Sequence, residues 1–416
     1  MLRLQVLPRA CLASTNSRAH VWLSALRTQR SSYHAERRPI PLKLPAGHST
    51  LLPLVLSCSN LVLQEVPGTI IPRYIVGSRT EDGSVHSEET VVPFLLSNPG
   101  TSPNASPEER RPVGFLRKEV TEAIVSDHTT SLFSELASPW DVQYSASSRQ
   151  TGTLPESISF APWVNMEGET SRTKHIQGLV KRWRSQGMFA DILRGWSDEA
   201  YPIFHHAPRL HEPKVDPVAF TIERAALPLF GFANFGCLLN AFYISPDTGK
   251  TRMWIPRRSM TKRTWPGKLD VTVGGGMGVG DTAEDTIVRE CVEEASLDAN
   301  YVRENVRPVG VLPFPNRSPA HWLLPGMYYL FDLPLPPDGT IAPRTNAADG
   351  EVESFELMDA DTVLHHLVEG RFKASSALAI VDFLIRHGLV TDRTDSRYTN
   401  LCRLLKREFI LPVPWR

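Results

Sequence analysis

Three glutamates, Glu290, Glu293 and Glu294, are the side chains whose type and spacing in this sequence could do chemistry. In a helix they fall within roughly 100° of arc, so their carboxylates share one face. Like charges at this spacing repel by on the order of a few tenths of a kcal/mol per pair, which a bound cation would relieve. Carboxylate oxygens suit Mg²⁺ or Mn²⁺. Acidic runs are more often solvated helix faces, so the spacing alone leaves both interpretations open.

The elements around these glutamates fit a positioned site. The opposite side of the same helix is apolar over Ile287, Val288, Cys291, Val292 and Ala295, which predicts a face packed on a core. The glycine run at 274–276 precedes the helix, and we expect the strand Leu269–Val273 to lead into it. Either Asp281 with Glu284 or Thr282 with Asp285 could cap the helix start, so Asp281 could be a cap instead of a site residue.

The stretch from Gly274 to Leu297 resembles the Nudix box, a glycine followed by spaced acids and an Arg-Glu…Glu-Glu core. The matching positions are Gly275, Arg289, Glu290, Cys291, Glu293, Glu294 and Leu297. Asp281 stands where the family has Glu, and Ser296 stands where it has a second Gly. The resemblance implies a hydrolase that cleaves a diphosphate linked to another moiety, with Mg²⁺ or Mn²⁺ as cofactor.

The resemblance also assigns roles within the box. Glu290, Glu293 and Glu294 would hold the cation, helped by a backbone carbonyl of the loop around Gly275. Arg289 lies roughly 40° to 150° around the helix from them, so we expect it to orient the carboxylates. The base that activates water is left open. Glu293 is one candidate, and the acids that begin a later strand are the alternatives: Glu351, Glu353 and Glu356.

A basic run between two expected strands could bind phosphate oxygens. Its candidate substrate-binding residues are Arg257, Arg258 and Lys268, with Trp265 between them as a surface on which a heterocycle could stack. Lysine and arginine also commonly protect the edge of a hairpin, so a solvated edge is the alternative. Trp322 has the same two interpretations, stacking partner or core.

A longer resemblance covers about the last 220 residues. The segments GWSDEAYP, FTIERAALPLFG, WIPRRSMTKRTWPGKLD, DGEVESFELM and GRFKASSALAIVDFLIRHG look like a fungal and plant Nudix subfamily described as thiamine pyrophosphokinase-related. That subfamily carries an N-terminal accessory domain and commonly has Ser in place of the last box glycine. It implies conversion of oxidised thiamine diphosphates to monophosphates.

Other functions remain as alternatives. Nucleoside diphosphates, including oxidised guanine forms such as 8-oxo-dGDP, are the rival substrates. A binding module that holds a diphosphate without cleaving it is a second possibility, although the intact glutamates count against it. An isoprenoid diphosphate isomerase would need a cysteine facing substrate, whereas Cys291 is expected on the buried face.

The pattern of strands and helices predicts an α/β fold. Strands are expected at Cys237–Tyr243, Arg252–Pro256, Arg307–Leu312, Trp322–Leu333 and Asp349–Met358, with helices at Val180–Arg194, Asp361–Glu369 and Ser375–His387. Together they predict a Nudix α/β/α sandwich with a mixed sheet, preceded by a smaller α+β accessory domain. The expected divisions are a leader at 1–35, an accessory domain at 51–207, a Nudix domain at 220–392 and a C-terminal tail at 393–416.

Composition narrows the partners. The 45 basic and 45 acidic residues balance, so no global charge indicates nucleic acid, and no apolar run is long enough to span a membrane. Five scattered cysteines indicate neither disulfides nor zinc. The expected partner is a small diphosphate, and oligomeric state is not indicated. The first 35 residues are rich in Arg and Ser without acids, which is typical of a mitochondrial transit peptide; a disordered basic tail of a cytoplasmic protein is the alternative.

Overall fold

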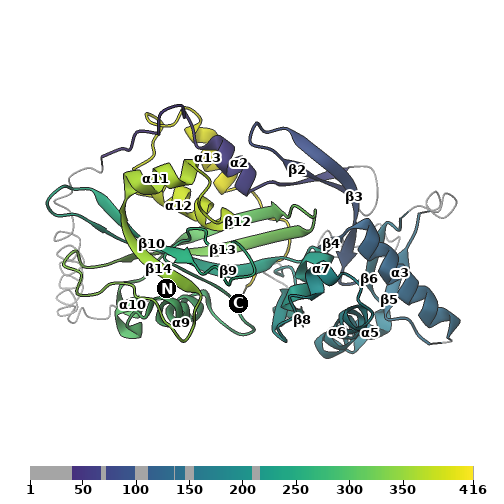
Figure 1. Cartoon of the computed structure of the whole chain (residues 1–416). Helices are drawn as coiled ribbons and strands as arrows, with labels where there is room; N and C mark the ends of the chain where they lie inside the picture. The colour runs from purple at the N-terminus through teal and green to yellow at the C-terminus, as the bar shows by residue number, and fades with distance from the viewer. Residues whose placement is uncertain are drawn as a thin grey trace, which may run out of the picture. The chain divides into compact units, whose positions relative to one another are not determined.

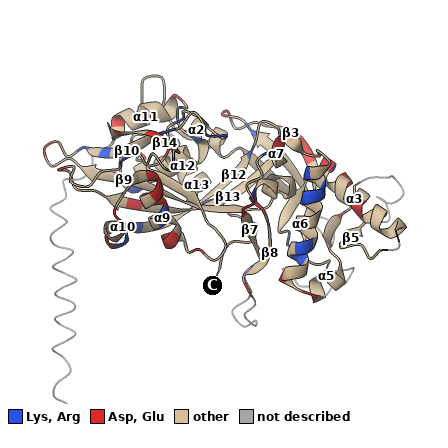
Figure 2. Cartoon of the chain, turned by 60° about the horizontal axis from the view of Figure 1, so that its bottom comes forward, with Lys and Arg blue, Asp and Glu red and all other residues tan. Residues whose placement is uncertain are grey.

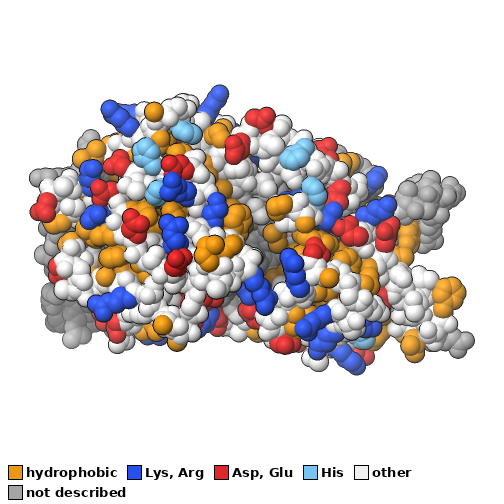
Figure 3. Space-filling view, viewed as in Figure 1, with side chains coloured by type: hydrophobic (Ala, Val, Ile, Leu, Met, Phe, Trp, Pro, Cys, Tyr) orange, Lys and Arg blue, Asp and Glu red, His pale blue; other side chains and the backbone are white. Residues whose placement is uncertain are grey.

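The computed structural model describes residues 40–66, 72–98, 111–134, 136–145, 154–208 and 216–415. The chain divides at Ile40, and everything below concerns the unit from Pro41 to Arg416. The leader expected at 1–35 lies outside the described residues. Within the described ranges, no helix is long and apolar enough to cross a bilayer. On the face shown in Figure 3, basic, acidic and apolar side chains are interspersed.

The first part of this unit is built on a mixed sheet with strand order β1-β2-β3-β6-β5, with β4 paired to β3. Only the β3–β6 pairing is parallel. The strands are β1 (Leu61–Val66), β2 (Arg73–Arg79), β3 (Val85–Leu95), β4 (Gly114–Leu116), β5 (Trp140–Gln143) and β6 (Ser157–Phe160). Phe94 and Phe160 are buried and meet edge to face, which anchors this sheet in the core.

Helices pack beside this sheet, and a two-stranded sheet leads out of it. The elements are α3 (Lys118–Phe133), α5 (Pro162–Met166), α6 (Glu169–Ser185), α7 (Ala190–Leu193), β7 (Ala200–Phe204), β8 (Val218–Glu223), η2 (Arg224–Ala226) and α8 (Leu227–Phe230). The single helix expected at Val180–Arg194 is wrong. It is two helices, because Gly187 and Phe189 both have positive φ, at 72° and 50°, and reverse the chain between them.

The second part is a mixed sheet with strand order β12-β13-β9-β10-β14, with β11 paired to β9. Only the β13–β9 pairing is parallel. The strands are β9 (Asn234–Ile244), β10 (Thr251–Arg258), β11 (Val273–Gly276), β12 (Arg307–Arg317), β13 (Leu323–Pro334) and β14 (Val352–Asp359). The strands expected at Cys237–Tyr243 and Arg252–Pro256 are present as β9 and β10, which pair antiparallel. The strand expected at Leu269–Val273 is wrong, because β11 begins only at Val273.

Helices cover both faces of this second sheet. Figure 1 shows α9 (Ala283–Ala295) and α10 (Ala299–Asn305) on one side, and α11 (Ala360–Val368) and α12 (Ala374–Arg386) on the other. The second layer also holds α2 (Leu52–Cys58) and α13 (Tyr398–Leu405). Two apolar clusters, one with Ile287 and Cys291 and one with Leu378 and Phe383, fill the spaces beneath these layers. The predicted sandwich of helices around a mixed sheet is confirmed.

The first and last described helices, α2 and α13, both pack into the second core. Leu51 is 1% exposed, and its backbone N–H donates to Asp395 Oδ2 at 2.7 Å. The helix α2 contacts α12 and α13, although its residues belong to the expected accessory domain. The segment expected as a tail contributes the buried Leu401 and Leu405 of α13. The domain limits stay predictions, but segments on both sides of them share one core.

Candidate active site

The helix α9 positions the acidic residues because its start and its buried face are both fixed. The backbone N–H of Asp285 donates to Thr282 Oγ1 at 2.9 Å, so Thr282 is the N-cap. Ile287, Val288, Cys291 and Ala295 are buried, as expected. Val292 is a correction, since it is 40% exposed, whereas Glu294 is only 8% exposed. One of the three glutamates of this helix is therefore buried against the protein. Figure 2 shows the acidic positions along α9 in red.

Glu290 lies directly over the glycine run. A Cβ on Gly275 would stand 2.1 Å from the Glu290 carboxylate carbon and from its Oε1, so only glycine leaves room for this carboxylate. Burial raises the pKa of Glu290, and the negative charges of Glu293 and Glu351 add to that rise. Arg289 acts in the opposite direction. The backbone of β11 thus lies close to the Glu290 carboxylate, whose negative charge is only partly balanced by Arg289.

Glu294 is the most buried of the three. The backbone N–H of Gly274 donates to its Oε2 at 3.1 Å. Burial raises the pKa of Glu294 well above the usual range, and the charges of Glu290, Asp270 and Glu351 raise it further. Glu351 shares a hydrogen bond with Glu294 and is ion-paired to Lys262 at 2.5 Å. Although burial acts to raise the pKa of Glu351, Lys262 lowers it, so the pKa values of these two neighbouring carboxyls shift in opposite directions.

Arg289 lies among the acids. Its Nη1 is 2.8 Å from Asp281 Oδ2, and its guanidinium is 3.5 Å from Glu290 and 3.9 Å from Glu293. The hydrogen bond to Asp281 is the main cause that raises the pKa of Arg289. Asp281 also accepts from the backbone N–H of Gly278 at 3.3 Å, so it ties the loop to Arg289 and leaves the helix cap to Thr282.

A family model described as the NUDIX domain matches residues 239–378, which includes this arrangement, and one described as a domain of unknown function (DUF4743) matches residues 144–234. Nudix hydrolase 20, chloroplastic, of Arabidopsis thaliana is 30% identical over 302 residues, covering 72% of this chain and 71% of that protein. The chain belongs to the Nudix hydrolase family. An uncharacterized protein of Saccharomyces cerevisiae is 32% identical over 253 residues, 58% of this chain and 69% of the relative.

Among solved structures, DR0079 of Deinococcus radiodurans is similar to this chain at 24% identity and a TM-score of 0.27. The match covers 35% of this chain and 80% of DR0079. Together, the matched family model and the Nudix hydrolase relative identify a Nudix-type hydrolase, an enzyme family that acts on small-molecule diphosphates and typically uses a divalent cation such as Mg²⁺ or Mn²⁺.

The donor set around α9 fits such a cation in chemical type. Glu351 raises the pKa of both Glu290 and Glu294, and Glu290 also raises that of Glu294, which indicates a local excess of negative charge. All their donor atoms are the oxygens that Mg²⁺ and Mn²⁺ prefer. Within the described ranges no three His, Cys, Asp or Glu side chains already converge on a metal position. Backbone carbonyls and waters would therefore complete the shell, as they usually do for Mg²⁺.

The three candidate alternative bases of this Nudix enzyme separate clearly. Glu351 acts on the pKa of both Glu290 and Glu294. Glu353 and Glu356 are exposed on β14, and Glu356 is paired in register with Ile255. Glu293, the candidate within the box, has a side chain that is 54% exposed, so it can reach a ligand approaching from solvent. The structure therefore brings Glu351, of the three later acids, to the box glutamates.

The predicted substrate-binding residues have different surroundings. Arg258 Nη1 is 2.8 Å from the buried carboxylate of Asp270, and its Nη2 donates to the Thr264 carbonyl, so Arg258 holds the loop together. Its role toward a substrate stays a prediction. Arg257 is exposed and donates to the Gly267 carbonyl at 3.0 Å. Lys268 Nζ donates to the Gly370 carbonyl at 2.7 Å.

The two tryptophans also differ. Trp322 is 6% exposed, and its Nε1 donates to Asp191 at 2.6 Å, so the core interpretation is right for it. Trp265 is 43% exposed and borders a cavity together with Lys268. An exposed indole beside a cavity is free to meet a ligand in the way that the buried one is not.

Sequence reasoning missed Asp270, the acid at the centre of a buried network. Its carboxylate accepts from Arg258, from Lys373 at 3.4 Å and from Ser376. Although burial acts to raise the pKa of Asp270, Lys373 and Arg258 lower it. The only signal in the sequence was an acid placed at the end of the basic run. Two of its partners, Lys373 and Ser376, stand about a hundred residues later, where no local pattern reveals them.

Proposed function

We propose that this Nudix hydrolase cleaves a diphosphate linked to a second moiety, with Mg²⁺ or Mn²⁺, and that its preferred substrates are oxidised thiamine diphosphates, which it converts to monophosphates. The observation that carries the chemistry is the set of under-neutralised carboxylates, Glu290 and Glu294, set against the glycine run of β11. The thiamine assignment is supported by the resemblance to the thiamine pyrophosphokinase-related subfamily.

The residues of this chain divide the work. Glu290, Glu293 and Glu294 would hold the cation, with a backbone carbonyl of the loop around Gly275. The cation supplies charge neutralisation of the diphosphate and a lower pKa for a bound water. Arg289, held by Asp281, keeps Glu290 and Glu293 in place. Positioning of this kind accounts for most of the catalysis in phosphoryl transfer.

The base that accepts the water proton is Glu293 or Glu351. Glu293 is exposed, and the guanidinium of Arg289 lies 3.9 Å from its carboxylate. Glu351 is kept ionised by Lys262, which lowers its pKa, so it can accept a proton. Glu351→Gln and Glu293→Gln, compared as pH–rate profiles, separate them, because replacing the base removes the acid limb of the profile.

The test of the function is cleavage by the purified full chain with Mg²⁺. The panel contains thiamine, oxothiamine and oxythiamine diphosphates beside ADP, 8-oxo-dGDP, NADH and ADP-ribose. We expect preference for the oxidised thiamine forms, lowered about 10²-fold or more in Glu294→Gln, the scale of losing one positioned electrostatic group. Cleavage of a nucleotide instead contradicts the thiamine assignment, and tight binding without any cleavage favours a binding module.

The isomerase alternative gains nothing from the structure. Cys291 is fully buried in the large apolar cluster, and burial raises the pKa of its thiol. A thiol in that setting cannot face the carbon skeleton of an isoprenoid diphosphate. Its side chain supports α9 from behind instead.

Mitochondrial import through residues 1–35 is a separate part of the proposal. It is supported by the arginine-rich, acid-free composition of that segment, and the plant relative described above carries the word chloroplastic in its name. A fluorescent fusion of the full chain should co-localise with mitochondria, and deletion of residues 2–35 should release it to the cytosol. Identical cytosolic fluorescence in both forms contradicts the import signal.

A further inference from the structure

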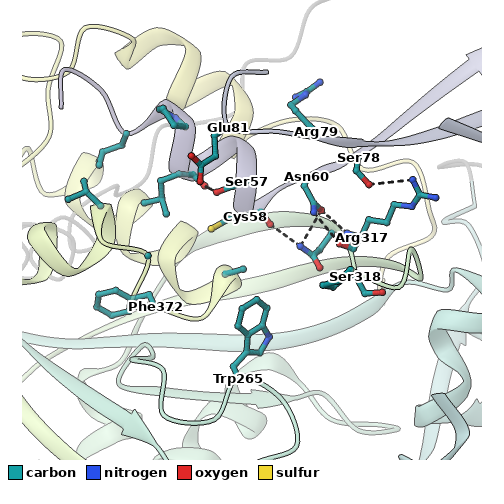
Figure 4. A pocket seen from close by; sticks show the side chains of 18 of the residues that line it. Ser57, Cys58, Asn60, Ser78, Arg79, Glu81, Trp265, Arg317, Ser318 and Phe372 are labelled. Atoms are coloured by element: carbon teal, nitrogen blue, oxygen red, sulfur yellow. Dashed lines mark hydrogen bonds between the residues drawn. The ribbon is translucent and has the colours of Figure 1, made fainter. Parts of the chain in front are cut away.

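A cavity of about 500 Å³ lies between segments from both ends of the chain, a size within the usual range of small-molecule pockets. One side comes from α2 and the turn after β2, with Ser57, Cys58 and Glu81. The other comes from the loop before β11 and the segment before α12, with Trp265 and Phe372. Figure 4 shows these two groups facing each other across the space.

The cavity wall contributed by the N-terminal segment is firmly held. The backbone N–H of Arg317 donates to Asn60 Oδ1 at 2.7 Å, and Asn316 Nδ2 donates to the Cys58 carbonyl at 3.2 Å. Arg317 also donates to Ser78 and is ion-paired with Glu89, with only 2% of its side chain exposed. Figure 4 shows these bonds joining the end of β12 to the N-terminal segment. The wall is therefore a pre-organised part of the pocket.

Two residues at the cavity have strained backbone conformations. Trp265 has φ of 56° and His321 has φ of 66°, the left-handed region that side chains other than glycine seldom adopt. Such residues persist where the surroundings enforce them, and they cluster at ligand sites. His321 Nδ1 is also buried with no hydrogen-bond partner among the described residues. An exposed indole and a histidine with strained backbone thus line the same cavity.

The loop between β10 and β11 connects this cavity to the box glutamates. Trp265 and Lys268 line the cavity, while Lys262, in the same loop, is ion-paired with Glu351, which hydrogen bonds with Glu294. The loop is closed on itself, since the Gly267 backbone N–H donates to the Arg258 carbonyl at 3.2 Å. A ligand that contacts Trp265 therefore lies against the segment that also reaches the acids of the site.

We propose that this cavity binds the non-phosphate moiety of the substrate, a planar heterocycle that stacks on Trp265, and that the N-terminal segment around Ser57 and Glu81 forms its far wall. This rests on the proposed diphosphate hydrolysis. The carboxylate of Glu81 favours a heterocycle that carries positive charge, and the indole face favours the same through its negative quadrupole. Lys268 also lines the cavity, and in the chain it stands between Trp265 and the glycine run of β11.

The test is steady-state kinetics of the full chain on oxothiamine diphosphate and thiamine diphosphate with Mg²⁺. Trp265→Ala should raise KM on the order of tenfold or more, as loss of an aromatic stacking platform does, with kcat within about twofold. Trp265→Phe should restore most of the affinity. Ser57→Trp, which fills the cavity from the N-terminal wall, should raise KM similarly. Phe133→Ala removes an aromatic that is 86% exposed on α3 and should change nothing.

The failure of this inference is distinct from failure of the proposed function. Unchanged KM in folded Trp265→Ala and Ser57→Trp, while Glu294→Gln abolishes turnover, overturns the cavity and leaves the hydrolase. If only a nucleotide is cleaved, the same KM comparison on that nucleotide decides. If nothing is cleaved, calorimetric titration with thiamine diphosphate decides, because equal affinity of wild type and Trp265→Ala contradicts the pocket and weaker binding by the variant supports it.

Discussion

Asp270 and Glu294 are two buried carboxylates, and the charge of Asp270 raises the pKa of Glu294, yet the protein holds them in opposite ways. Asp270 is ion-paired with Arg258 at 2.8 Å and with Lys373 at 3.4 Å, and it accepts a hydrogen bond from the Ser376 hydroxyl. Glu294 receives one backbone N–H, from Gly274. Burial acts to raise the pKa of both. The two cations reverse this for Asp270, whereas the pKa of Glu294 ends well above the usual range.

The difference separates a structural acid from one suited to a ligand. A buried charge is costly unless it is paired and hydrogen bonded, and Asp270 has all that it needs within the chain. Glu294 lacks a cation of its own, and its nearest acidic neighbours, Glu290 and Glu351, make the deficit larger. A divalent cation would neutralise the carboxylates around Glu294, whereas Asp270 is already neutralised by Arg258 and Lys373.

Asp270→Asn should have the largest effect, because it leaves the partly buried Arg258 and Lys373 without their common partner. Removing one member of a buried ion pair costs about 3–5 kcal/mol. We expect a loss of this size in the free energy of unfolding, measured by urea denaturation at neutral pH. Lys250→Ala is the matched control, since its ion pair with Asp361 at 3.6 Å is half exposed on both sides and should be worth under about 1 kcal/mol.

The same variant predicts a pH dependence. The folded-state pKa of Asp270 is lowered, so its ionised form adds stability above the unfolded pKa of about 3.9, and that stability is lost as pH falls through the lower folded value. The gap in unfolding free energy between wild type and Asp270→Asn should therefore narrow below about pH 4. A gap that stays constant down to acid pH contradicts ionisation of Asp270 as the source.

Glu294→Gln should leave stability nearly unchanged in metal-free buffer, in contrast to Asp270→Asn. Glutamine keeps an acceptor for the Gly274 N–H and has no charge to bury. Saturating Mg²⁺ should stabilise wild type by about 2–3 kcal/mol at a hundredfold excess over Kd, through binding to the folded state alone. The variant should lose most of this gain, measured by thermal unfolding with and without Mg²⁺. Equal stabilisation of both proteins contradicts Glu294 as a ligand.

Only part of this site could be predicted from the sequence. The spacing of Glu290, Glu293 and Glu294 predicted their common face, and the resemblance predicted the family. The sequence could not predict that Glu294 is buried and Val292 exposed. Both residues lie at the border of the apolar face of α9, and the way the helix packs on the sheet determines which of them is covered. The role of Asp270 could not be predicted either, nor could the absence of a strand over most of Leu269–Val273. Lys373 and Ser376 draw that segment to the start of α12, a contact between residues a hundred positions apart.

Gly275→Ala tests whether the position of the Glu290 carboxylate matters for activity more than for stability. A Cβ at this position would meet the Glu290 carboxylate, the movable end of a flexible side chain, so the chain can fold if Glu290 moves aside. We expect roughly a tenfold loss in kcat/KM, because displacement of a positioned group by about an ångström is costly, with less than about 1 kcal/mol lost in stability. Gly276→Ala is the control, since its Cβ would meet no atom within 4 Å. Equal losses in both variants argue against the crowding of Glu290.

Ser296→Gly should have the smallest effect and the opposite sign. Ser296 ends α9 with φ of 51° and ψ of 33°, and the Leu297 N–H donates to the Cys291 carbonyl at 3.1 Å, closing a Schellman turn. A left-handed residue with a side chain costs about 1 kcal/mol more than glycine there. Urea unfolding should show that gain with unchanged kcat/KM, since the substitution leaves every charge near Glu294 in place. If activity changes as well, backbone strain at the end of α9 helps to position its acids, and charge balance alone does not explain why Glu294 and Asp270 differ.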